Sequence, residues 1–231
     1  MTAFSRSKHA PKHPWLATLA FLLLFVGLSA AAPAEPASEQ PDESSEQKFR
    51  NKGWILDRIT IEGAERPGVR RLHATGRIAL PAFDVWRIIA YNGGAKEWPS
   101  VKESIVEKSV GDTLVKRYTV SVPVFKDRRY RLQSIVDDQK RQVRFELVPG
   151  YGNVREIRGS WTVLEISDSL TTVLYQLDTD PGVKLIPGFI VSWATKHAVP
   201  RLYEFIHDQG MDGAVARAGM ERRRDGDGRG R

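Results

Sequence analysis

Six short segments between residues 103 and 177 alternate apolar and polar side chains, and turn residues separate them. Alternation with a period of two is typical of strands that bury one face, and short connections join antiparallel neighbours. Lys116, Tyr118 and Val120, for example, share one face of their segment. The pattern predicts an antiparallel meander with strands at residues 103–108, 113–122, 128–136, 142–147, 154–166 and 171–177.

Further elements are predicted on both sides of the meander. Two strands are expected over residues 54–61 and 71–80, and residues 82–90 have the apolar spacing of a short helix. An amphipathic pattern over residues 187–208 predicts a long helix, with a kink at Pro200 and an end at Gly210. This order indicates an α+β fold, in which a curved antiparallel sheet wraps around the long C-terminal helix. An internal apolar cavity between sheet and helix is then the natural ligand site.

The N-terminal residues have the three-part pattern of a secretory signal peptide. Basic residues precede the apolar residues 15–28, and small residues continue to Ala34. The sequence Ala32-Pro33-Ala34 predicts cleavage before Glu35. The alternative is an uncleaved anchor, because residues 15–34 as a helix would span about 30 Å. We therefore expect a periplasmic protein, or one tethered to the inner membrane.

Composition divides the chain into four parts. Residues 1–34 are the signal peptide, residues 35–52 an acidic linker rich in Pro and Ser, and residues 53–210 the folded domain. Residues 211–231 form a tail rich in Arg and Gly. The linker and the tail are expected to be disordered, because neither contains enough apolar residues to bury.

The charge and the missing cysteines exclude several classes of function. The net charge is +7, but the signal peptide and the tail carry much of it. The remaining basic pairs, such as Lys116-Arg117 and Arg128-Arg129, are interpreted as a solvated face, with attraction to anionic lipid headgroups as the alternative. Nucleic acid is not an expected partner of an exported protein. With no cysteine, the chain has no disulfide, thiol nucleophile or cysteine metal site.

No catalytic or metal-binding motif stands out in the sequence. HExxH, GxSxG, P-loop and GxGxxG patterns are absent, so we expect no cofactor, no metal and no enzymatic activity. His197 is interpreted as a core histidine, with contact to a ligand as the alternative. Asp178 and Asp180 are interpreted as capping the next turn rather than binding calcium.

Five motifs occur together in one order along the chain. They are AFDVW at 82–86, EWPSV at 97–101, KDRRY at 126–130, GSWTV at 159–163, and DTDPG at 178–182 followed by Ile186-Pro187. In this order they resemble the StAR-related lipid transfer (START) domain of the helix-grip superfamily, which also includes polyketide cyclases and coenzyme Q-binding proteins. The resemblance runs from about residue 54 to 208. Ser134 stands where some sterol-binding members carry a buried arginine, which weakens a sterol assignment.

The resemblance implies a hydrophobic cavity between the sheet and the last helix, and a loop before that helix that gates access. A cavity would also explain why many large, partly polar rings point inward. The expected lining residues are Trp98, Tyr118, Tyr130, Phe145, Ile157, Trp161, Val173, Tyr175, Ile186, Phe189, Ile190, Trp193 and His197. The expected gating loop contains Asp180, Pro181, Gly182, Pro187 and Gly188.

The resulting hypothesis is an exported, monomeric START-like protein that binds and carries one lipid or other hydrophobic molecule and contacts membranes transiently. Two alternatives stay open. One is an enzyme of the cyclase or dehydratase type that uses Tyr175, His197 or Asp180 as acid or base. The other is a quinone-binding module.

Overall fold

The computed structural model describes residues 43–64, 68–91, 98, 101–121, 127–180, 182 and 194–227. Within these ranges, residues 43–44, 194–195 and 214–227 are described by their backbone alone. None of the helices within the described residues has an apolar stretch of the length needed to cross a membrane.

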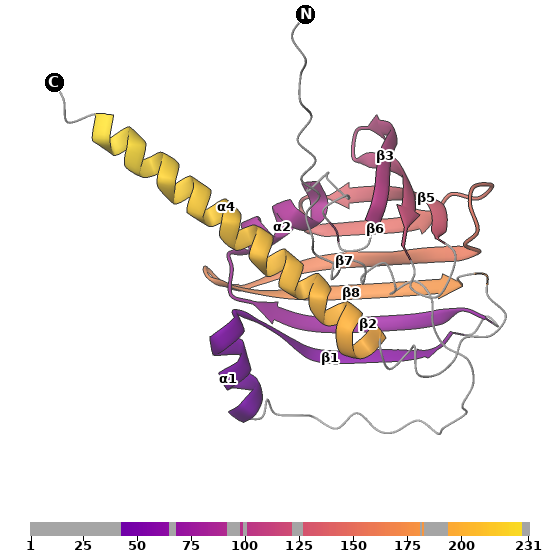
Figure 1. Cartoon of the computed structure of the whole chain (residues 1–231), viewed down its shortest axis with the longest axis horizontal. Helices are drawn as coiled ribbons and strands as arrows, with labels where there is room; N and C mark the ends of the chain where they lie inside the picture. The colour runs from indigo at the N-terminus through magenta and orange to yellow at the C-terminus, as the bar shows by residue number, and fades with distance from the viewer. Residues whose placement is uncertain are drawn as a thin grey trace, which may run out of the picture.

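Eight antiparallel strands form one curved, open sheet (Figure 1). The strands are β1 (Trp54–Gly63), β2 (Arg70–Ile78), β3 (Val101–Val110), β4 (Thr113–Val120), β5 (Arg128–Asp137), β6 (Gln142–Leu147), β7 (Glu156–Ser167) and β8 (Leu170–Asp180). Their spatial order is β1-β2-β8-β7-β6-β5-β4-β3, so β1 and β3 are the edges. The predicted meander of six strands is confirmed, and the two earlier strands extend it beside β8.

The helices are α1 (Glu43–Lys52), α2 (Ala82–Tyr91) and α4 (Val199–Asp227), with a π-helical turn, η2 (Ala194–Ala198), directly before α4. The helix α4 packs across β1 and β2 and against α2, while α2 packs on β6, β7 and β8. Both helices therefore lie on the same face of the sheet, which we call the inner face (Figure 1). Alternation along the strands places Leu72 and Ile78 of β2 and Leu177 of β8 in this core.

The prediction that Gly210 ends the last helix is wrong, because α4 continues to Asp227 and covers much of the tail expected to be disordered. Gly210 is buried, and a Cβ atom at this position would lie 2.3 Å from Leu80 Cδ1. Gly210 lies inside α4, where it allows the helix to pack closely against Leu80 and Ile88, and it is not a left-handed cap. Pro200, where a kink was expected, is the second residue of α4, where the π-helical turn passes into the α-helix.

A second difference is α1, which forms within the linker that was expected to be disordered. Its one large apolar side chain, Phe49, packs against the Arg77 guanidinium at 5.2 Å. Glu46 forms an ion pair with the same Arg77 at 2.9 Å. These contacts to β2 stabilise a helix whose composition alone favours disorder.

Both edge strands carry β-bulges. The extra residue is Asp57 in β1, and Lys102 and Glu107 in β3. All three bulged residues are charged, and each forms an ion pair with a residue from another segment of the chain. The pairs are Asp57–Arg77 at 2.9 Å, Lys102–Asp127 at 2.8 Å, and Glu107–Arg131.

Candidate functional site

Aromatic side chains cover the inner face on β4 to β8. We call Tyr118, Tyr130, Phe145, Trp161 and Tyr175 the aromatic wall. Tyr118 and Tyr130 are register partners and stack with ring centroids 5.4 Å apart, and Trp161 stacks on its register partner Tyr175 at 3.9 Å. The Phe145 ring lies over Gly159, where a Cβ atom would approach its Cζ to 2.6 Å. Strand alternation therefore gathers the predicted aromatic residues on one surface.

Trp98 connects the aromatic wall to the C-terminal helix. Its ring centroid lies 6.2 Å from that of Trp161 and 4.9 Å from that of Phe205 on α4. Ile157 and Val173 are buried in the same core. These described members of the predicted lining set thus form one continuous surface between sheet and helix.

The structure gives no hydrogen bond between the hydroxyl groups of Tyr118, Tyr130 or Tyr175 and another described residue. Burial raises the pKa of Tyr118 to about 12, and it also raises the pKa of Tyr130 and Tyr175. By contrast, the buried Tyr203 on α4 donates a hydrogen bond to the Val173 carbonyl at 3.0 Å. Buried polar atoms are normally paired, so the wall differs from an ordinary core.

Two largely buried cations, one on β4 and one on β5, lie on the same face as the tyrosines. Lys116 and Arg128 are only 9% and 8% exposed, and burial lowers the pKa of each. Neither was predicted as a site residue, because each belongs to a basic pair that was interpreted as part of a solvated face. The alternation that places Tyr118 inside also places Lys116 inside, so the signal was present in the pattern.

The other predicted site residues lie away from the aromatic wall or outside the described residues. His197 is exposed on η2. The carboxylate of Asp180 accepts a hydrogen bond from the Gly182 amide at 2.8 Å, so Asp180 caps the turn after β8. The remaining candidates lie outside the described residues, namely Pro181, Ile186, Pro187, Gly188, Phe189, Ile190 and Trp193.

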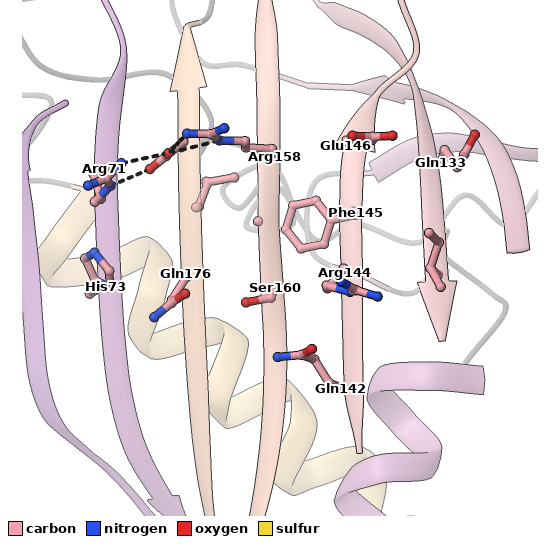
Figure 2. A pocket seen from close by; sticks show the side chains of 14 residues that line it. Arg71, His73, Gln133, Gln142, Arg144, Phe145, Glu146, Arg158, Ser160 and Gln176 are labelled. Carbon is pink, nitrogen blue, oxygen red and sulfur yellow. Dashed lines mark hydrogen bonds and ion pairs between the residues drawn. The ribbon is translucent and has the colours of Figure 1, made fainter. Parts of the chain in front are cut away.

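The opposite face of the sheet, which we call the outer face, has a hollow of about 570 Å³ (Figure 2). Its floor is polar and includes a cross-strand row of His73, Gln176, Ser160 and Arg144. In the next row, Asp178 accepts hydrogen bonds from Arg71 at 2.9 Å and from Arg158 at 3.0 Å. These bonds, that from Arg71 first, lower the pKa of Asp178.

The two faces offer different chemistry. In the outer hollow, Arg71 and Arg158 are paired with Asp178, and most of the residues that line it have polar or charged side chains. The inner face presents buried rings together with polar atoms that lack partners in the described part of the chain. A hydrophobic molecule with a polar end fits the inner face better.

Solved structures with the same architecture include the STAR-related lipid transfer protein from Xanthomonas axonopodis, which has 20% sequence identity and a TM-score of 0.53, with 67% of this chain and 98% of that chain covered. The START superfamily protein from Mycobacterium smegmatis has 12% identity and a TM-score of 0.52, over 62% and 97% of the two chains. The Zhui aromatase/cyclase from Streptomyces sp. R1128 has 19% identity and a TM-score of 0.50, over 65% and 96%.

These likenesses show that the chain has the helix-grip α+β fold, as predicted. No protein-family model matches the sequence, and no curated protein matches it at a significant level. Because the same fold occurs in a lipid transfer protein and in a cyclase, function has to be argued from the site.

Proposed function

We propose that the protein binds a single lipid or other hydrophobic molecule against the aromatic wall, and carries it without covalent chemistry. The observation that carries this proposal is the wall itself, a buried aromatic surface whose hydroxyls lack partners among the described residues. Each CH₂ group of a ligand removed from water contributes about 0.8 kcal/mol, so such a surface holds an alkyl chain firmly. The lipid transfer protein from Xanthomonas axonopodis provides a precedent for this role on the same fold.

The positions of the alternative catalytic residues also support binding. Tyr175 lies on the inner face, His197 is exposed on η2, and Asp180 caps a turn at the end of β8. General acid–base catalysis needs its groups within hydrogen-bond reach of one substrate. Burial raises the pKa of Tyr175 further above neutral pH, so its phenol can donate a hydrogen bond to a ligand and is a poor general base.

The cellular setting is part of the proposal. The signal-peptide pattern at residues 1–34 supports export to the periplasm, where a lipid carrier would meet membranes transiently as a monomer. Fractionation of cells that produce the full chain tests this, since the protein should appear in the periplasmic extract or, if tethered, with the inner membrane. Recovery from the cytoplasm would contradict export.

Lipid extraction tests the binding function directly. We expect organic extracts of the purified protein to contain a stoichiometric hydrophobic molecule, which mass spectrometry would identify as a lipid or a quinone. Trp161→Leu removes the ring that stacks on Tyr175 and should weaken binding of a fluorescent lipid about tenfold. Arg144→Gln, on the outer face, should leave binding unchanged. Absence of both a co-purified molecule and probe binding would overturn the proposal.

A further inference from the structure

We infer that the molecule bound at the aromatic wall carries an anionic group, a carboxylate or a phosphate, and that Lys116 and Arg128 receive it. This inference rests on the proposed binding function and names the chemical class of its ligand. The predicted ligand is thus an anionic amphiphile, either a fatty acid or an acidic phospholipid, rather than a neutral lipid.

The two cations flank the tyrosine pair of the wall. On β4, Lys116 precedes Tyr118 on the inner face, and on β5, Arg128 precedes Tyr130 on the same face. Because Tyr118 and Tyr130 are register partners on antiparallel strands, one cation lies on each side of the stacked rings. An anion over these rings would meet two cations and two phenol donors.

Neither cation has a counter-charge in the described part of the chain. The structure gives no hydrogen bond or ion pair to either side chain, and Nε of Arg128 is buried without a partner. The neighbouring inner-face positions on β4 and β5 carry no charge, namely Leu114, Tyr118, Val120, Tyr130, Leu132 and Ser134. Outside the described residues, the internal segments of the sequence contain two further carboxylates, those of Glu65 and Glu97.

On the outer face, arginines that contribute to the structure are paired with carboxylates. Arg71 and Arg158 pair with Asp178, and Arg131 pairs with Glu107. These cations are more exposed than Arg128, yet each has a carboxylate nearby. Burying an unpaired cation costs free energy, so the two unpaired cations on the inner face favour a bound anion as their counter-charge. The lowered pKa values of both groups reflect the same cost.

Binding of matched anionic and neutral ligands tests the inference. Delipidated full-length protein would be titrated with palmitate and hexadecanol, and with phosphatidic acid and diacylglycerol of the same chains, by displacement of a fluorescent lipid. We expect at least a tenfold preference for the anionic member of one pair, because hydrogen bonds to charged groups contribute that much. The pair that shows the preference identifies carboxylate or phosphate as the anion.

Charge variants assign the preference to the two residues. The double variant Lys116→Met, Arg128→Met should lose the preference for the anion and keep its affinity for the neutral ligand within about twofold. The charge-retaining variants Lys116→Arg and Arg128→Lys should keep the preference, which separates loss of charge from loss of packing. Arg144→Met, which removes an exposed cation from the outer face, is the matched control and should behave as wild type.

The outcomes separate this inference from the proposed function. If wild-type protein binds neither member of either pair, the binding function itself fails. If it binds neutral and anionic ligands equally, and the double variant changes neither, the inference is overturned while lipid binding stands. As an independent readout, the ligand-free double variant should melt at a higher temperature than wild type, because two unpaired buried cations have been removed. A lower melting temperature together with an unchanged ligand preference would also overturn the inference.

Discussion

The inner face of the sheet has two halves, one under α4 and one on β4 and β5. Buried polar atoms have hydrogen-bond partners in the first half and lack described partners in the second. Under α4, the Tyr203 hydroxyl bonds to the Val173 carbonyl, and the buried Thr171 hydroxyl bonds to the Leu80 carbonyl at 2.7 Å. On β4 and β5, the hydroxyls of the tyrosine pair and the two buried cations have no partners among the described residues.

The difference indicates that one half of the sheet serves mainly stability and the other half serves binding. In the half under α4, the helix lies directly on the sheet, since a Cβ atom on Gly76 would lie 2.7 Å from Tyr203 Cε1. The hydroxyl groups of Tyr203 and Thr171 are both paired within the protein. In the half that bears the aromatic wall, tyrosine hydroxyls and two cations have no partner among the described residues. This lowers the stability of the folded protein, but it leaves these groups available to a bound molecule.

Truncation of core side chains should give the largest contrast between the halves. Ile206→Ala, at a fully buried position on α4, should lower the free energy of unfolding by about 3 kcal/mol. Leu132→Ala, at a half-buried position beside the wall, should cost about 1 kcal/mol, because less packing is lost. Urea unfolding of both variants measures the difference. Equal losses would show that the two halves are packed alike.

Removal of a single hydroxyl group should again destabilise the half under α4 more than the half on β4 and β5, but by a smaller amount. Tyr203→Phe should cost about 1 kcal/mol, because the Val173 carbonyl loses its donor in a buried site. Tyr130→Phe should be neutral or slightly stabilising in the ligand-free protein, because its hydroxyl has no partner in the described part of the chain. Thermal unfolding of the two variants side by side makes the measurement. A comparable loss in Tyr130→Phe would argue that this hydroxyl is already paired.

The pH dependence of stability should give the smallest contrast. The pKa of Lys116 is lowered by burial from its ordinary value of 10.5, so between the folded and unfolded pKa values the unfolded state binds more protons. The free energy of unfolding of wild type should therefore rise, relative to that of Lys116→Met, as the pH increases toward 10.5. Unfolding curves of the two proteins at several alkaline pH values measure this difference. Parallel pH profiles would mean that the Lys116 ammonium is solvated.

The strands could be predicted from sequence because alternation is a local signal, and the residues of β4 and β5 show it clearly. The helix α1 could not, since it depends on Phe49 packing against Arg77 from another element. Gly210 looked like a helix end because close packing and a left-handed cap both require glycine. The rings of the site were predicted, but its cations were not. Neighbours in sequence such as Lys116 and Arg117 were interpreted as one basic pair, although a strand places them on opposite faces.

The charged bulges at Asp57, Lys102 and Glu107 also bear on how the molecule behaves at high concentration. An open sheet has two free edges, and a regular free edge is a template for cross-molecular strand addition and fibril growth. Each bulge interrupts the spacing of backbone donors and acceptors along its edge and places a charge there. The charged bulges therefore disfavour the addition of a strand from another molecule at either edge of the open sheet.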